Sequence, residues 1–235
     1  LGASESMRSK LAEYNDPRLS RAFITKQGTS GKEQAPGTAD NAVYAPNGTP
    51  EQGTSKYGTS LFMYSISAPT LLLSYHELKF LEAEALCRLE RDAKSALKDA
   101  VVAGLLNAEN SFTISRKELG KTLINAASSI TEAEAESYFD NTIEAKYTAE
   151  PLKTTMTQKY FALWGASGEA TESYNDVRRM KGLGENFIEL KNPNSFPLRC
   201  PYGNSDTTTN AEVKAAYGNG QYVYSENVWW AGGSR

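Results

Sequence analysis

Residues 69–106 read PTLLLSYHELKFLEAEALCRLERDAKSALKDAVVAGLL, and this stretch decides the fold. In its first half, apolar side chains recur at steps of three and four. The spacing predicts a helix with one apolar stripe, made of Leu71, Tyr75, Leu78, Leu81, Ala85, Leu86 and Leu89. The acidic residues between them are expected on a solvated face, where Glu84 and Arg88 form a favourable pair one helical turn apart.

A second helix is expected after a short turn. Asp92 is placed to cap it, and its apolar face comprises Ala93, Ala96, Leu97, Ala100, Val101, Gly104 and Leu105. The small residues on that face allow two helices to approach closely. We therefore predict an antiparallel helical hairpin over 71–106, the unit of a tetratricopeptide-like array, although no second copy occurs at the same period.

Further helix boundaries follow the hairpin. Capping boxes at Ser115–Glu118 and Thr131–Glu134 predict two helix N-termini. Pro151 suits the first turn of another helix, and Gly182 ends the last one. Convincing strand pairs do not occur. The predicted fold class is all-α: a tetratricopeptide-like helical hairpin plus further helices with long ordered loops.

The segment 28–60 is dense in Gly, Pro, Thr, Ser and Asn, which favour turns. Solvated linkers rarely carry many rings, yet rings recur along it and just beyond. We interpret it as an ordered loop packed on the helices, and Tyr44 and Tyr57 as ligand-binding, because loops on rigid scaffolds commonly carry function. At the other end, Trp229 and Trp230 suit either sugar stacking or packing of the tail on the helices, and packing is favoured.

Composition excludes several classes of function. The formal net charge of -3 and the lack of a basic stripe argue against a nucleic-acid partner. Two cysteines and one histidine do not make a usual zinc site, and phosphate-binding glycine motifs are missing, so we predict no metal and no cofactor. The sequence lacks an apolar run long enough to span a membrane.

The most charged stretch contains Glu172, Asp176, Arg178 and Arg179. These side chains either pin a ligand carboxylate or phosphate, or pair with one another and hold the last helix to its neighbours. The second interpretation is favoured because acids and arginines are interleaved. His76 has no accompanying nucleophile motif and is interpreted as a surface or packed helix residue, so we predict no catalytic residues and no enzyme.

Several motifs, taken in order, resemble the SusD/RagB family. They are Asn15–Leu19 (NDPRL), Ala68–Ala85, Gln158–Gly165 (QKYFALWG) with Glu169, Asn175, Asp176, Arg178 and Arg179 after it, Phe196–Arg199 (FPLR) and the closing Val228–Trp230. Each motif is weak alone, but their order and spacing cover nearly the whole chain. Two departures are Thr171, where the family carries tryptophan, and the missing lipobox.

The resemblance implies a non-catalytic nutrient-binding lipoprotein of the Bacteroidetes outer membrane, about twice as long as this chain. Such proteins lie at the cell surface, anchored through a lipidated N-terminal cysteine, over a TonB-dependent SusC-type transporter. Residues 1–235 would then be the C-terminal part of one SusD-like domain, with a loop-rich segment at 1–68, a helical body at 69–182 and an irregular C-terminal segment at 183–235. The hairpin would be its last tetratricopeptide-like unit.

The expected function is binding of a glycan or oligosaccharide for that transporter. One alternative is a peptide-binding member of the same family. Another is a protein-interaction scaffold that docks the transporter without a ligand of its own. A glycosidase would need two carboxylates facing one another across a cleft.

Overall fold

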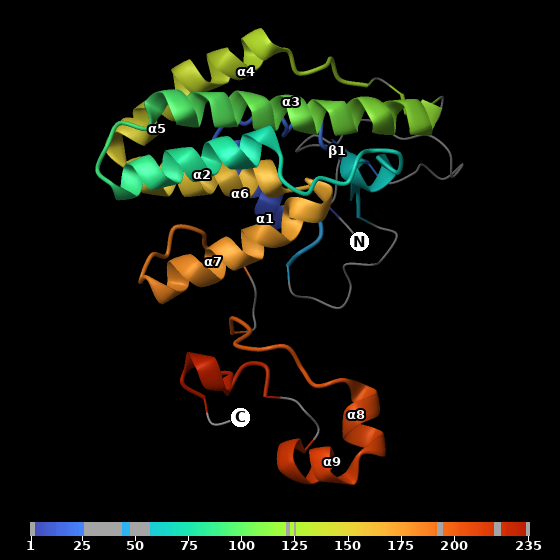
Figure 1. The fold of residues 1–235 in the computed structure, drawn as a ribbon. Helices are drawn as coiled ribbons and strands as arrows, with labels where there is room; N and C mark the ends of the chain where they lie inside the picture. The colour runs from blue at the N-terminus through green and yellow to red at the C-terminus, as the bar shows by residue number, and fades with distance from the viewer. Residues whose placement is uncertain are drawn as a thin grey trace. The chain divides into compact units, whose positions relative to one another are not determined.

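The protein is mainly helical in the computed structural model (Figure 1), which describes residues 3–25, 44–47, 57–120, 123–124, 126–191, 195–218 and 222–233. The chain divides into two compact units, Leu1–Lys191 and Asn192–Arg235. Within the described residues, no helix is both long enough and apolar enough to cross a membrane.

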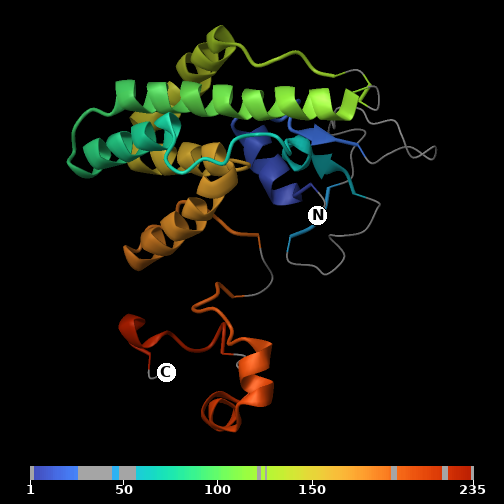
Figure 2. The same ribbon diagram turned by 45° about the vertical axis from the view of Figure 1, so that its right-hand side comes forward.

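The predicted hairpin is present as α2 (Tyr75–Arg88) and α3 (Lys94–Leu119). The two helices run antiparallel and stay side by side in both views (Figures 1 and 2). The N-cap of α3 is Ala93, which makes no side-chain cap, and the predicted capping role of Asp92 is met from one residue before it, where its Oδ1 accepts a hydrogen bond from the Lys94 amide at 3.0 Å.

One boundary in the hairpin was predicted wrongly. Helix α3 continues to Leu119, so Ser115 lies within a helix and does not begin one. Its hydroxyl instead donates to the carbonyl oxygens of Leu61, at 2.7 Å, and Ser111, at 2.9 Å. A buried serine that bonds back to its own helix and across to a neighbouring segment needs no helix end.

Further helices of the first unit follow the hairpin along the chain, and several of them pack against it (Figure 1). They are α4 (Glu132–Tyr138), the π-turn η4 (Phe139–Ile143), α5 (Glu144–Ala149), α6 (Pro151–Leu163), the 3₁₀ turn η5 (Ser167–Thr171) and α7 (Glu172–Gly182). The predicted boundaries at Thr131, Pro151 and Gly182 are confirmed, but the helix that ends at Gly182 is not the last one, because two short helices follow it in the second unit. A Cβ on Gly104 would lie 2.9 Å from that of Ala162, so the glycine permits the close approach of α3 and α6.

The N-terminal segment is more regular than expected. It contains α1 (Glu5–Glu13), β1 (Phe23–Ile24), β2 (Thr59–Ser60) and the 3₁₀ turn η2 (Leu61–Tyr64). The expectation of no strand pair was therefore wrong, because β1 and β2 pair antiparallel with Phe23 opposite Ser60. Two-residue strands leave no alternating pattern in a sequence. Most of the predicted ordered loop at 28–60 lies outside the described residues.

The orientation of α2 is opposite to the predicted one. Its buried face carries Phe80 and Ala83 together with three ionisable residues, His76, Glu77 and Glu84. The predicted apolar stripe is largely exposed, with exposed fractions for Tyr75, Leu78, Leu81 and Leu89 of 60%, 52%, 41% and 64%. We call these four residues the outer face of α2.

The second unit contains α8 (Asn204–Thr209), α9 (Ala211–Tyr217) and the 3₁₀ turn η6 (Trp229–Ala231). The rings of Tyr202 and Tyr217 stack with centroids 4.4 Å apart. Trp229 and Trp230 are exposed and meet edge to face, 5.5 Å between centroids. Packing of this tail on the helices of the first unit stays a prediction.

Candidate functional site

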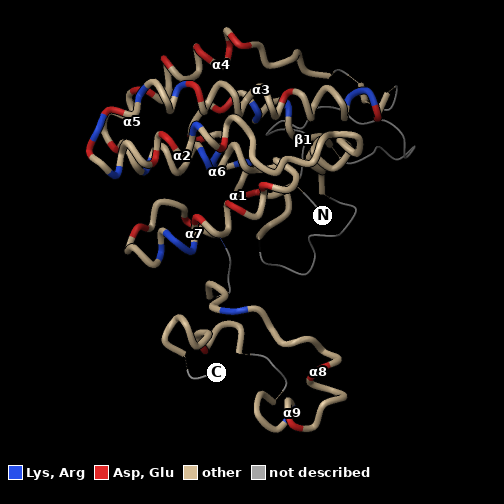
Figure 3. Tube along the Cα trace, viewed as in Figure 1, with Lys and Arg blue, Asp and Glu red and all other residues tan. Residues whose placement is uncertain are grey.

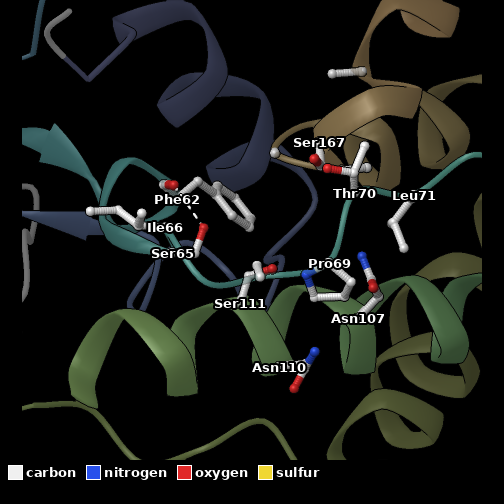
Figure 4. A pocket seen from close by; sticks show the side chains of 14 residues that line it. Phe62, Ser65, Ile66, Pro69, Thr70, Leu71, Asn107, Asn110, Ser111 and Ser167 are labelled. Atoms are coloured by element: carbon white, nitrogen blue, oxygen red, sulfur yellow. Dashed lines mark hydrogen bonds between the residues drawn. The ribbon is translucent and has the colours of Figure 1, made fainter. Parts of the chain in front are cut away.

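The first unit contains a pocket of about 410 Å³ between α3, the segment 65–71 that precedes α2, and the turn 165–170 that precedes α7. Ligand sites in proteins are commonly clefts of roughly 300–1,000 Å³, so the volume suits a small ligand or part of a longer one. Figure 4 shows Asn107, Asn110 and Ser111 on α3, Ser167 on the opposite turn, and Pro69–Leu71 between them.

The lining is polar and uncharged. None of its residues, all in the described part of the chain, is acidic, basic or histidine; they are Phe62, Ser65, Ile66, Ala68, Pro69, Thr70, Leu71, Asn107, Asn110, Ser111, Gly165, Ala166, Ser167 and Ala170. Hydroxyl and carboxamide groups both donate and accept hydrogen bonds. Such a set matches a neutral, hydroxyl-rich molecule, and it lacks the fixed charge that a carboxylate, phosphate or ammonium group would need.

One wall depends on Gly165, whose φ of +81° strains any side-chain-bearing residue. A Cβ at this position would collide with the Phe62 ring. The centroid of that ring, which belongs to η2, lies 4.8 Å from the Phe112 centroid and 5.0 Å from the Trp164 centroid. These contacts hold the ring between α3 and the end of α6. The aromatic part of the pocket is therefore held rigidly by the core.

The other two walls touch one another. Gly168 lies against the Leu71 carbonyl so closely that a Cβ would collide with it. Next to this contact, the Glu169 carboxylate accepts a hydrogen bond from the Ser74 amide. Glu169 is only 2% exposed, so the segment before α2 and the turn before α7 are joined through a buried carboxylate.

A second carboxyl group lies beside that junction. Ser74 and Glu77 form half of a capping box, because the Ser74 hydroxyl accepts from the Glu77 amide at 3.1 Å. The other half is taken by Glu169, which binds the Ser74 amide in place of the Glu77 carboxyl. Burial, together with the charge and the hydrogen bond of Glu169, raises the pKa of Glu77 to about 7.

His76 completes this buried group. Its Nε2 lies 3.2 Å from the Ser74 hydroxyl and 3.6 Å from Glu169 Oε2, and the ring is 2% exposed. Burial lowers the pKa of His76 below its usual value despite the opposing effect of Glu169. The packed-helix interpretation of His76 is thus the one confirmed.

On α7, which carries both acidic and basic residues (Figure 3), the favoured interpretation of the charged stretch is confirmed for Asp176 and Arg179, whereas Glu172 accepts from Asn175 and Arg178 donates to Tyr174. Arg179 donates to Glu84 of α2 and to Asp176, and Asp176 also pairs with the buried Lys159 at 2.8 Å. Arg88 donates to Glu84 at 2.7 Å. Burial alone would raise the pKa of Glu84, but the hydrogen bonds from the two arginines outweigh it and lower that pKa. These charges pair within the protein.

The expectation that the glutamates of α2 lie on a solvated face was wrong for Glu77 and Glu84, which are both 6% exposed. The predicted pair of Glu84 with Arg88, one helical turn apart, exists, but Glu84 is buried and also bonds to Arg179 of α7. Glu82 alone follows the prediction, exposed and bonded to Lys79 at 2.9 Å.

Tyr44 and Tyr57, predicted to bind ligand, flank the backbone of Ala3, which bonds to Ala45 and Gly58. The Tyr44 ring meets Phe23 edge to face, 5.2 Å between centroids, and is half-buried. Tyr57 is 6% exposed. Neither lines the pocket in Figure 4. Their role in ligand binding stays a prediction.

Sequence reasoning missed the pocket residues. Asn107 and Asn110 lie three residues apart on α3, which places them on one face of a helix. That spacing was a usable signal, but polar residues on an exposed helix are common, and the opposite wall comes from turns distant in sequence. Two other cavities suit a neutral ligand less well, because charged residues make up more than half of the lining of one, beside α1, and half of the lining of the other, which lies between α2, α3 and α4.

Comparison with known proteins gives a consistent picture. Residues 2–202 match the profile of a SusD-like family described as starch-binding and associating with the outer membrane. Among curated proteins, none matches the chain. A crystallised SusD/RagB family protein of Bacteroides thetaiotaomicron is 65% identical, with a TM-score of 0.89, over 100% of this chain and 50% of that one.

Two more distant structures share the fold. A SusD homologue of Bacteroides fragilis is 18% identical, with a TM-score of 0.59, over 96% of this chain and 51% of its own. An outer-membrane protein of Bacteroides vulgatus, described as a candidate for nutrient binding, is 21% identical, with a TM-score of 0.60, over 95% of this chain and 50% of its own. The chain therefore spans about half the length of the solved proteins that it matches.

Proposed function

Because the chain belongs to the SusD-like family, we propose that it is part of a non-catalytic nutrient-binding protein at the outer membrane, and that its ligand is a neutral oligosaccharide. The observation that carries the ligand class is the uncharged polar lining of the pocket in Figure 4. A charged ligand would leave its charge without a partner there, at a large desolvation penalty. The family's association with starch points the same way.

The wider assignment rests on the family alone. We propose that residues 1–235 form the C-terminal part of one SusD-like domain, held at the cell surface by a lipid anchor in another part of the protein. A TonB-dependent SusC-type transporter would receive the oligosaccharide. The half-length match to the solved relatives supports a longer protein in which this chain is one part.

Binding is tested by calorimetric titration of neutral oligosaccharides, maltoheptaose among them, with uronic-acid oligosaccharides and peptides in the same series. We expect binding by a neutral sugar and loss of most of that affinity in the double variant Asn107→Ala, Asn110→Ala. Alanine favours helix, so the variant should remain folded. Asn141→Ala is the matched control, since Asn141 is an exposed asparagine of η4 that bonds to Ser137. A peptide that binds in place of every sugar would replace the proposed ligand class.

The scaffold alternative has one observation in its favour, the exposed outer face of α2. In that case the chain would bind the transporter through this face and bind no soluble ligand. Two results together would favour the scaffold: the chain co-purifies with the transporter and Leu78→Gln abolishes this, and neither the sugars nor the peptides bind.

A further inference from the structure

We propose that Glu77 and Glu169 form a proton-sharing latch that holds two walls of the pocket together, so that ligand binding there weakens above neutral pH. The latch would regulate the pocket, and its effect on ligand binding rests on the proposed function. Glu169 is the positioning residue: it is not itself one of the residues that line the pocket, but it fixes the segments that supply them.

The geometry calls for a proton. Glu169 Oε1 is occupied by the Ser74 amide, while Oε2 is buried and has no hydrogen-bond donor among the described residues. His76 Nε2 is 3.6 Å from that oxygen, beyond hydrogen-bond distance. An ionised carboxylate accepts only, so the Glu77 carboxyl satisfies Glu169 only when it carries a proton. The pKa of Glu77, about 7, agrees with this arrangement.

The charges around the pair do not replace that proton. Lys159 of α6 favours ionisation of Glu77, but its ammonium group is already 2.8 Å from Asp176 of α7. Glu172 of α7 acts in the opposite direction. On the other side, Arg18 is held by Asp16 at 2.6 Å and disfavours a charge on His76.

Loss of the proton leaves two negative charges in a buried space. Like charges at short range repel strongly there, and separation of the two carboxylates is the direct relief. Separation moves the turn at 165–170 away from the segment at 65–71, because Glu169 and Ser74 join them. Those segments supply most of the pocket lining, so the pocket loses its shape.

The latch is tested first without any ligand, by hydrogen exchange of the Ser74 amide between pH 6 and pH 8.5, with rates corrected for intrinsic exchange. In the wild type we expect protection to fall as pH rises through about 7. In Glu77→Gln it should stay high, because the carboxamide donates to Glu169 at every pH. Glu82→Gln, on the exposed side of the same helix, should behave as the wild type. If Glu77→Gln does not fold, Glu169→Gln provides the same donor from the other side.

The second arm uses maltoheptaose as the probe. With binding fully coupled to the shared proton and a pKa of about 7, affinity falls about fivefold between pH 7 and pH 8, and Glu77→Gln removes that fall. Protection that does not change with pH, or that falls equally in Glu77→Gln, overturns the latch. Protection that titrates while maltoheptaose binds equally at every pH overturns its control of the pocket. Protection that titrates without any sugar binding supports the latch and contradicts the proposed function instead.

Discussion

The two faces of α2 differ in an unexpected direction. The face toward the protein carries His76, Glu77 and Glu84 beside Phe80, whereas the outer face carries a tyrosine and three leucines. These ionisable side chains are tolerated inside because each has a partner: the two arginines for Glu84, Glu169 for Glu77, and the Ser74 hydroxyl for His76. An apolar stripe therefore identifies a surface suited to packing, but it does not show that this chain supplies the segment that covers it.

The largest expected effect is on the inner face. Phe80→Ala removes a fully buried ring that packs over Gly104 of α3, and we expect the free energy of unfolding to fall by about 3–5 kcal/mol. Urea denaturation at pH 7 measures it. Leu78→Ala, two residues earlier on the outer face, is the matched control and should lower stability by less than about 1 kcal/mol. Equal losses in the two variants would remove the distinction between the faces.

The sequence predicted most of the helical framework, and for clear reasons. Helix caps and breakers act locally, so Asp92, Thr131, Pro151 and Gly182 could be interpreted without knowledge of the fold. The charged side of α7 was also interpretable, since its acids and arginines are close in sequence. The helix start predicted at Ser115 was wrong because a capping motif within a long helix has the same sequence as one at a helix start.

What could not be predicted depends on contacts between distant segments. The burial of Glu77 follows from Glu169, which is far along the chain, and no local pattern announces that pairing. The pocket likewise joins α3 to two turns that separate segments bring together. The orientation of α2 was mistaken because periodicity counts apolar residues, and here the buried side holds paired charges.

The next largest effect should come from Glu84. Glu84→Gln leaves Arg88 and Arg179 with weaker acceptors, although Glu185 and Asp176 still bind them. We expect a loss of about 2 kcal/mol at pH 7, below that of a fully buried pair because both arginines reach solvent. Thermal denaturation against the wild type measures the loss.

The difference in stability between the wild type and Glu84→Gln should depend on pH. The folded-state pKa of Glu84 is lowered, so its contribution is present above the unfolded pKa and is lost as pH falls through the folded one. The wild type should therefore lose its advantage over Glu84→Gln in acid. An advantage that does not shrink as pH falls below the ordinary value of 4.5 would contradict this assignment of the charge.

The contribution of Glu77 to folding stability should depend on pH with the opposite sign, and it should be smaller than that of Glu84. Its folded-state pKa is raised to about 7, so its stabilisation is complete below the ordinary value of 4.5 and is lost as pH rises through 7. Glu77→Gln should raise the melting temperature relative to the wild type at pH 8.5 and change it little at pH 4. A lower melting temperature for the variant at pH 8.5 would show that the ionised carboxylate is the stabilising form.

The smallest effect on stability is expected for Leu78→Gln, which lies on the outer face of α2. In this 235-residue chain the side chain is 52% exposed, so we expect a change within about 0.5 kcal/mol by urea denaturation. We propose that in a protein of the relatives' full length another helical layer covers this face, since the solved relatives are about twice as long.

The same substitution would then bury a polar carboxamide against apolar side chains and lower stability by about 2 kcal/mol or more. Glu82→Gln, a neighbouring exposed change, should be silent in both lengths. A difference between the two lengths that appears for Leu78→Gln and not for Glu82→Gln would make the outer face an interior surface of the longer protein. Equal small effects in both lengths would leave it free for a separate partner, which is the condition that the scaffold alternative requires.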